Sequence, residues 1–508
     1  MNKNNILYIL IFFLIGSASA QTNNQDIKSY KFNIVLNDNN DTIDVVSTIK
    51  GITHNNTVTL NLEKSMIIQK IESNNLDLTY GRINDSLYIT VYDKDFSLDI
   101  HYRGKPIDGL IIGKNKYGSR TFFGDNWPNR AKNWLTVYDH PSDKAKVEFI
   151  VTAPSKYTVV SNGKLVSMTT SKTSATYNYK TTYELSTKLM VIGVAEFLNK
   201  NVQKMPFEIS SFAYPKDKYT VLENYSIAPQ ITLFYEGLLG RYPFNKLYNV
   251  QSTTKYGGME NAGCIFYDEN VVEANRTESL IAHEIAHQWF GNAVSEKDWN
   301  HLWLSEGFAT YLENMYLENK YGKDTLDYLM NESRLRVLAF KNKYPNKVLV
   351  PEVVNSPNEM LNTYSYQKGA WVLHMLRIEL GDDTFFKILK TFYSAYKYSN
   401  ANTNDFISVA SKVSEVNIKP LLEPWLYSNT LPKYDVKWTY SDGKIIGEIV
   451  QQQGDTFKNT IDLLIKYSNT SVLKRVKIES KNQSFEFSSN TSPNSVILDP
   501  HNSILKDK

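Results

Sequence analysis

The sequence predicts a multidomain α+β protein, and three observations support that prediction. The chain has 508 residues, which is more than one hydrophobic core normally holds. Its first part alternates like short strands, its middle part has helical periodicity, and its last part alternates again. We therefore expect a β-rich N-terminal domain over residues 21–203, a mainly helical domain over 204–434, and a small C-terminal β-sandwich over 435–508.

The first twenty residues have the three-part pattern of a cleavable secretory signal. Lys3 precedes an apolar run of about eleven residues, "ILYILIFFLIG", and the small residues Ala18 and Ala20 follow it. The run is too short for a comfortable membrane span. We expect a signal peptide over residues 1–20, export to the periplasm or the medium, and no stable membrane insertion afterwards. An uncleaved anchor helix is the alternative.

Composition and charge exclude some classes of partner. The chain is 42% apolar and 21% charged, as is usual for soluble globular proteins. Its net charge of +3 is spread along the sequence, which gives no reason to expect nucleic acid or an acidic membrane surface as partner. Cys264 is the only cysteine, so an exported form has no internal disulfide and depends on core burial.

Residues 27–200 predict strands, because apolar and β-branched residues alternate with polar ones. The segments "SYKFNIVL", "DSLYITVYD" and "AKVEFIVTAP" show this pattern, and Asn, Asp and Gly separate such segments. The spacing favours a large antiparallel sandwich or curved sheet.

From about residue 204 the periodicity becomes helical. The segments "RTESLIAHEIAHQWFG", "LSEGFATYLENMYLENKYG" and "SYQKGAWVLHMLRIELG" place apolar residues three or four apart. Each ends at Gly, as helices often do. The segment "LYNVQSTTKYGGMENAGCIFYD" indicates strand and loop among these helices. After about residue 435 the short strands return.

The helix predicted over "TESLIAHEIAHQWFG" presents a candidate metal site. His283 and His287 are four residues apart, so their rings project side by side and can reach one ion at about 2.0–2.1 Å. Glu284 lies about 100° around the helix. There it can overhang the ion without binding it and act as a base towards water on the metal.

Such a site needs a third protein ligand, with a fourth position open for water. Glu306 lies eighteen intervening residues after His287, near the start of a second helix that can fold back antiparallel. Two His and one Glu form the ligand set of hydrolytic zinc enzymes, so we expect one Zn²⁺ per chain. Glu313, two turns further along the same face, is expected to accept a hydrogen bond from one ligand histidine. The alternative is a chance string on a solvated helix face.

Two further stretches concern the substrate of the amide or ester hydrolysis that such a site performs. In "YGGMENAG", Gly257 and Gly258 allow close approach of an extended substrate, and Glu260 can bind a free ammonium. A tight turn with a surface glutamate is the alternative. In "SYQKGA", the phenol of Tyr366 can donate to the oxyanion formed during attack, although this residue is one of 34 tyrosines.

The motifs "GGMEN", "HEIAHQWFGN", "WLSEGFA" and "YQKGA" together resemble one known family. They occur in the order and at about the spacing of the aminopeptidase N family of zinc metallopeptidases, in the gluzincin clan, to which leukotriene hydrolase also belongs. The match is dense from about residue 250 to 375. The resemblance implies a saddle-shaped N-terminal sheet domain, a thermolysin-like catalytic domain and the small β-sandwich.

The resemblance also implies roles for the motif residues. It implies zinc ligation by His283, His287 and Glu306, with Glu284 as general base and Tyr366 stabilising the tetrahedral intermediate. It implies that Glu260 anchors the substrate's α-amine, so that peptides with a free N-terminus lose one residue at a time. The other residues expected to contact substrate are Gly257, Gly258, Met259 and Asn261.

The sequence departs from the family's pattern in three respects. No counterpart of the family's long C-terminal helical domain is expected within these 508 residues, so we expect a cleft that is either more open or closed by dimerisation, and the oligomeric state stays open. The family often has a Gln or Glu from the N-terminal domain that assists amine binding; Asp125 and Asn126 lie in that neighbourhood without a clean match. Ser305 stands where Asn is common, beside a ligand.

Two other functions remain as alternatives. A zinc endopeptidase needs a cleft open at both ends and no amine anchor, so replacing Glu260 with Ala distinguishes it from an aminopeptidase. A catalytically silent peptide-binding protein of the same fold is the third possibility, although Glu284 and Tyr366 argue against it. The preferred N-terminal residue does not follow from the sequence, because it depends on loops that form the side-chain pocket.

Overall fold

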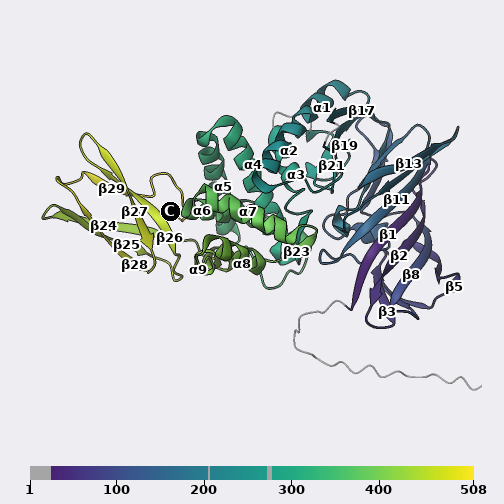
Figure 1. Ribbon diagram of the computed structural model, residues 1–508, viewed down its shortest axis with the longest axis horizontal. Helices are drawn as coiled ribbons and strands as arrows, with labels where there is room; N and C mark the ends of the chain where they lie inside the picture. Colours follow the sequence, from purple (N-terminus) through teal and green to yellow (C-terminus); the bar gives the residue numbers. More distant parts are fainter. Residues whose placement is uncertain (1–23, 204–205, 272–276, 508) are drawn as a thin grey trace, which may run out of the picture.

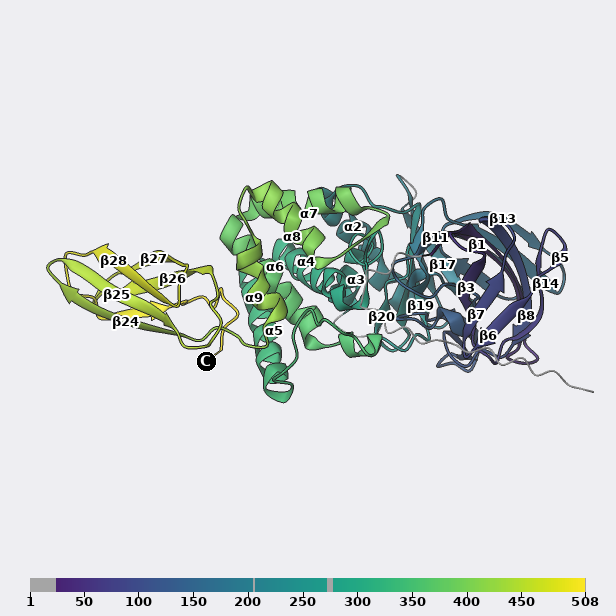
Figure 2. The same cartoon turned by 90° about the horizontal axis from the view of Figure 1, so that it is seen from below.

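The chain forms three consecutive parts along one long axis (Figure 1). The computed structural model describes residues 24–203, 206–271 and 277–507. Strands at one end are followed by a helical middle part and by a strand-rich C-terminal part, and Figure 2 shows the same order from below. The expected signal peptide lies outside the described residues. Within them, no helix combines the length and apolar character that a membrane crossing requires.

The largest sheet of the N-terminal part follows the alternation of its sequence. In β1 (Gln25–Val35), buried and exposed residues alternate along most of the strand. The strands of this sheet lie in the order β13-β14-β11-β1-β2-β8-β4-β5, with β15 beside β11. The other bounds are β2 (Ile43–Thr53), β4 (Ile67–Ser73), β5 (Leu76–Asp77), β8 (Asp95–Gly104), β11 (Lys144–Pro154), β13 (Lys164–Thr170), β14 (Ser174–Lys180) and β15 (Leu185–Ser186).

One pair in that sheet differs from the antiparallel expectation. β1 and β11 are parallel, while the other pairs of the sheet are antiparallel. A parallel pair requires a long crossover connection, and more than a hundred residues separate these two strands. The alternation within each strand carries no information on this long-range pairing.

Two smaller sheets complete the N-terminal part. One has the order β12-β16-β10-β9 and the other the order β3-β7-β6. After β10 the chain continues towards the middle part of the molecule, and this connection contributes to the site described below. The bounds are β3 (Thr57–Asn61), β6 (Tyr80–Ile83), β7 (Ser86–Thr90), β9 (Leu110–Lys114), β10 (Arg120–Gly124), β12 (Thr158–Ser161) and β16 (Ile192–Ala195).

The middle part begins with a five-stranded sheet of order β17-β18-β19-β21-β20. Its short edge strand β20 (Gly258–Met259) comes from "GGMEN" and pairs with β21 on one side only. The first strand, β17, precedes residue 204, so this sheet joins segments from both sides of that position. The other bounds are β17 (Leu198–Gln203), β18 (Glu208–Ala213), β19 (Lys246–Ser252) and β21 (Cys264–Asp268).

Helices make up the rest of the middle part. α3 ends at Ala286, one turn earlier than the sequence indicates, and turns continue the chain to Gly291. A single π-helical turn, Tyr364–Lys368, leads directly into α6. The short strands β22 (Val294–Glu296) and β23 (Ser399–Ala401) pair in parallel. The α-helices are α1 (Lys218–Asn224), α2 (Ala228–Leu239), α3 (Thr277–Ala286), α4 (Trp303–Tyr321), α5 (Lys323–Lys343), α6 (Gly369–Leu380), α7 (Asp382–Tyr396), α8 (Thr403–Ser414) and α9 (Lys419–Tyr427).

The C-terminal part consists of two three-stranded antiparallel sheets, β24-β25-β28 and β27-β26-β29. The backbone N–H of Thr460 donates to Glu379 of α6 at 3.0 Å, and Trp425 of α9 packs edge-on against Phe457. These contacts attach the sheets to the helices. The bounds are β24 (Tyr434–Ser441), β25 (Lys444–Gln451), β26 (Asn459–Lys466), β27 (Ser471–Ile478), β28 (Asn482–Ser488) and β29 (Ser495–Leu498).

Candidate metal centre and active-site cleft

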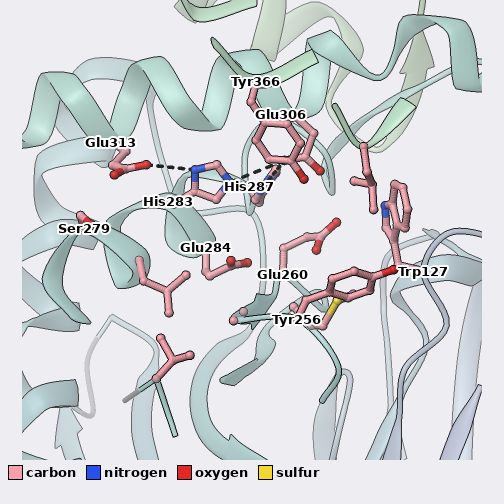
Figure 3. Close-up of a pocket in the computed structure, with 16 residues that line it drawn as sticks. Trp127, Tyr256, Glu260, Ser279, His283, Glu284, His287, Glu306, Glu313 and Tyr366 are labelled. Carbon is pink, nitrogen blue, oxygen red and sulfur yellow. Dashed lines mark hydrogen bonds and ion pairs between the residues drawn. The ribbon is translucent and has the colours of Figure 1, made fainter. Parts of the chain in front are cut away.

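Three side chains converge where α3 packs against the start of α4. The two Nε2 atoms of His283 and His287 are 3.1 Å apart, and Oε2 of Glu306 lies 3.5 Å and 3.2 Å from them. Ligand atoms placed tetrahedrally at about 2.0–2.1 Å from zinc lie about 3.3 Å from one another, so these separations fit a metal site. Among the described His, Cys, Asp and Glu residues, this cluster is the group close enough to hold an ion (Figure 3).

The far nitrogen of each imidazole also has a hydrogen-bond partner. Nδ1 of His283 lies 3.2 Å from Glu313, and Nδ1 of His287 lies 3.1 Å from the carbonyl of Phe290. The hydroxyl of Ser305, the residue that stands where the family commonly has Asn, is 3.2 Å from the same Nδ1. An acceptor at Nδ1 holds the proton there and leaves the lone pair of Nε2 pointing at the cluster.

The carboxylates of the cluster have different electrostatic surroundings. Burial favours the protonated form of Glu306, but the two histidines outweigh it and lower the pKa of Glu306 well below its usual range. Burial raises the pKa of Glu284 to about 8, against the opposing effect of the same histidines. Glu306 therefore stays ionised as a ligand must, whereas Glu284 has the proton affinity expected of a base working near neutral pH.

Glu284 lies against the edge strand β20. A Cβ atom at position 258 would lie 2.2 Å from Oε1 of Glu284, so only glycine fits beside the carboxylate in this arrangement. Gly257 has more room, because its nearest neighbour is Val271 at 3.9 Å. Gly258 is therefore required for the packing of the candidate base against the backbone, and the approach of a substrate to the two glycines stays a prediction.

Glu260 is buried, which excludes the surface-turn alternative. Its side chain is 5% exposed, and Oε1 has no hydrogen-bond partner within the described part of the chain. Its backbone carbonyl accepts from Nε2 of Gln288 at 2.9 Å and from Nδ2 of Asn292 at 2.6 Å. Sequence reasoning missed these two amides, although both belong to "HEIAHQWFGN" and Gln288 lies one helical turn after Glu284.

Tyr366 lies on the π-helical turn and faces the histidines. Its ring is nearly parallel to that of His283, with centroids 6.2 Å apart. Desolvation and the nearby carboxylates raise its pKa well above the ordinary value, so the phenol stays protonated and can act as a donor. Single π-helical turns often occur at functional sites, where they redirect one side chain.

One cavity of about 410 Å³ joins these groups (Figure 3). The predicted metal ligands line it, as do Glu284, Tyr366, Glu313 and residues 257–260, whereas Asn261 does not line it and is fully buried. Among the described residues that line it there are four glutamates and neither lysine nor arginine, so this lining favours positively charged ligands. Because β20 forms one side, an extended chain can pair with the strand edge beside Glu260.

Asp125 and Asn126 do not line this cavity. Both are fully buried: Asp125 pairs with Arg130, and Asn126 donates to the carbonyls of Thr187 and Met190. The next residue, Trp127, lines the cavity instead. Trp127 was not expected from the sequence, because strand alternation does not extend into this irregular connection.

Two family models match the chain. The model described as "Peptidase family M1 domain" matches residues 225–425, which include the three clustered ligands, Glu260 and Tyr366. The model described as "Peptidase M1 N-terminal domain" matches residues 21–189.

Curated relatives include several aminopeptidases. A probable aminopeptidase 2 of Sulfurisphaera tokodaii is 26% identical over 69% of this chain and 47% of its own length. A leucyl aminopeptidase of Saccharolobus solfataricus is 26% identical over 78% of this chain and 52% of its own. The tricorn protease-interacting factor F2 of Thermoplasma acidophilum is 28% identical over 73% of this chain and 49% of its own length. The chain spans about half the length of these relatives.

Proposed function

The chain belongs to the M1 peptidase family, and from this premise we propose that it is a zinc-dependent aminopeptidase. It removes the N-terminal residue from peptides with a free amine. The observation that supports this proposal best is the single cavity that contains both a His–His–Glu cluster and the buried, unpartnered carboxylate oxygen of Glu260. The aminopeptidases among the relatives favour the same activity.

The proposed metal ligands are His283, His287 and Glu306. When bound there, Zn²⁺ would polarise the scissile carbonyl and increase the acidity of water. Glu284 takes the proton from the attacking water and delivers it to the leaving amine. Tyr366 donates to the carbonyl oxygen as negative charge develops on it. Glu313 holds the ring of His283 in the orientation that ligation requires.

Glu260 sets the position at which the peptide is cut. A substrate ammonium bound there gains a charge-assisted hydrogen bond and satisfies a buried carboxylate oxygen that has no partner among the described residues. With its amine at Glu260 and its carbonyl at the ligand cluster, the substrate has room for one residue between them. An endopeptidase would leave Glu260 buried without a counter-ion, which is costly.

We also propose the finer organisation of the chain. Residues 21–203 form a saddle-shaped sheet domain, 204–434 a thermolysin-like catalytic domain, and 435–508 a small β-sandwich. Residues 1–20 act as a signal peptide that exports the protein to the periplasm or beyond.

The test is a panel of aminoacyl-coumarin substrates with metal analysis of the purified protein. We expect coumarin release that a chelator abolishes and zinc restores. Glu260→Ala should lower kcat/KM on free-amine substrates by about a hundredfold or more, as loss of a buried charge pair does. Glu223→Ala, on the exposed side of α1, is the matched control and should have no effect.

Two outcomes contradict the proposal. Undiminished cleavage of N-acetylated peptides by Glu260→Ala would indicate an endopeptidase. No chelator-sensitive release from any substrate would indicate a silent binding protein.

A further inference from the structure

One wall of the active-site cavity is formed by aromatic and aliphatic side chains, and one of them, Trp127, comes from the N-terminal part of the chain. Trp127 lies in the connection after β10 and lines the cavity together with Tyr256, Met259 and Leu361. In Figure 3, Trp127 and Tyr256 lie beside Glu260, on the side away from His283 and Glu313. If the substrate's amine lies at Glu260 and its carbonyl at the metal ligands, the first side chain is the group that contacts this wall.

The wall is held rigidly by its neighbours. The Trp127 ring packs edge-to-face against Trp299 and Tyr256, with centroid distances of 5.8 Å and 6.5 Å. Nε of Arg130 donates to the carbonyl of Trp127 at 2.7 Å, and its guanidinium lies over the Tyr256 ring. Asp125 accepts a hydrogen bond from the backbone of Lys255, which ties the two segments together. A preorganised wall selects ligands by fit, because it needs no rearrangement on binding.

The indole N–H of Trp127 is a buried donor that finds no acceptor among the described residues. The side chain is 2% exposed, and Figure 3 shows the nitrogen on the ring edge that faces Glu260. A buried donor without an acceptor is costly, so a ligand that supplies an acceptor at this point binds better than one of the same shape that does not. The neighbouring Asn126 does not supply it; its side-chain oxygen accepts from Trp134.

We propose that Trp127 determines which N-terminal residues the site accepts, and that it selects large, neutral side chains with a hydrogen-bond acceptor near the tip. Tyrosine is the coded example that fits best. Its ring contacts Trp127, Tyr256 and Leu361, and its oxygen accepts the indole N–H. Acidic side chains are disfavoured by the carboxylate of Glu260 beside the wall. Small side chains leave the apolar surface uncovered. This inference rests on the proposed aminopeptidase function.

The test compares tyrosyl-coumarin with 4-methylphenylalanyl-coumarin, which has the same shape but carries no acceptor. Wild-type protein should favour the tyrosyl substrate in kcat/KM by about five- to tenfold, the effect of one neutral hydrogen bond. Trp127→Phe keeps an aromatic wall and removes the donor, so it should bring that ratio close to one. Trp438→Phe, the same change in β24 of the C-terminal part, should leave the ratio as in wild type.

Trp127→Ala removes both donor and wall, and should in addition lower the ratio of tyrosyl to alanyl substrate. An unchanged ratio of tyrosyl to 4-methylphenylalanyl substrate in Trp127→Phe overturns the proposal. Equal rates on those two substrates with wild-type protein also overturn it, and that measurement does not depend on any variant folding. Failure of the proposed function has a different signature, namely no chelator-sensitive release from any of the substrates.

Discussion

At the scale of single residues, the motif around His283 and His287 also positions a third group. The side-chain amides of Gln288 and Asn292 both donate to the carbonyl of Glu260, so the segment that carries two proposed metal ligands also fixes the position of the proposed amine anchor. The distance between Glu260 and the two histidines is therefore fixed by two hydrogen bonds and a short stretch of backbone. In the proposed function, this arrangement would hold the substrate carbonyl at the ligand cluster even though Glu260 lies on a loop.

One residue outside the cavity gives a pH-dependent prediction. Asp143 is 5% exposed; Oδ1 accepts from the backbone of Ile27 at 3.3 Å, and Oδ2 has no partner among the described atoms. Burial raises its pKa from 3.8 to about 8. Because the folded state disfavours the charged form, the stability that Asp143 contributes falls as pH rises from about 4 to about 8.

Asp143→Asn should therefore stabilise the protein by about 1–3 kcal/mol at pH 8.5 and by clearly less at pH 5.5. Asn keeps an acceptor for Ile27 and removes the buried charge. Urea unfolding at the two pH values measures the difference. Asp435→Asn, at an exposed position of β24, is the control and should be neutral at both. An equal gain at both pH values would show that ionisation of Asp143 is not the cause.

At the scale of elements, the site depends on a contact between two helical backbones. A Cβ at Gly307 of α4 would lie 2.8 Å from Cα of Gly369, and one at Gly369 would lie 2.9 Å from Cα of Gly307. Gly307 follows the ligand Glu306, and Gly369 begins α6, three residues after Tyr366. The two glycines thus set the separation between a proposed ligand and the proposed oxyanion donor.

Gly369→Ala should lower kcat by about 10- to 100-fold, because a displacement of about 1 Å at a catalytic group has an effect of that size. Overpacking should also destabilise the fold by about 1–3 kcal/mol. The same substitution in a Tyr366→Phe background should have a much smaller effect on kcat, since the group it displaces no longer donates. Steady-state kinetics of the four proteins measures this coupling.

Gly237→Ala is the matched control for that cycle. Gly237 lies in α2, and a Cβ there meets no atom within 4 Å, so the substitution should be neutral or slightly stabilising. Full additivity of Gly369→Ala and Tyr366→Phe would mean that the glycine contact acts on something other than Tyr366.

Local patterns in the sequence predict most elements, because side-chain direction in a helix or strand follows from a few neighbouring residues. That is why the spacing of His283 and His287 predicts that both rings lie on the same face of the helix, and in the structure their Nε2 atoms are 3.1 Å apart. The parallel pairing of β1 with β11 could not be predicted, because it joins strands distant in sequence. The same holds for Trp127, whose neighbours Trp299 and Leu361 lie far along the chain.

At the scale of the whole molecule, the N-terminal part supports the site directly. Nζ of Lys144 donates to the carbonyls of Asn292 and Ala293 at 3.1 Å and 3.0 Å. Nδ2 of Asn162 donates to the carbonyl of Ala262 at 2.9 Å. These contacts hold the two segments that carry "GGMEN" and "HQWFGN". The N-terminal part therefore shapes the cavity both through Trp127 and through the backbone behind it.

A buried ion pair joins the same two parts. Nζ of Lys188, in the N-terminal part, lies 2.6 Å from Glu296 of β22, with side chains 1% and 0% exposed. Lys188 also lies over Trp299, the ring that supports Trp127. Although burial opposes it, Glu296 and the more distant Glu260 and Glu306 raise the pKa of Lys188, so the ammonium stays charged.

Lys188→Met should destabilise the protein by about 3–5 kcal/mol, because it leaves Glu296 buried without its ion-pair partner. The double variant Lys188→Met/Glu296→Leu removes both charges and should regain most of that loss, which urea unfolding can measure. Lys419→Met, in an exposed ion pair with Glu423, is the control and should change stability by less than about 1 kcal/mol. If the double variant is no more stable than Lys188→Met, the charge left on Glu296 is not what destabilises the single variant. The loss of stability would then come from the lost packing of the Lys188 side chain against Trp299. Packing, and not the ion pair, would then hold the N-terminal and middle parts together.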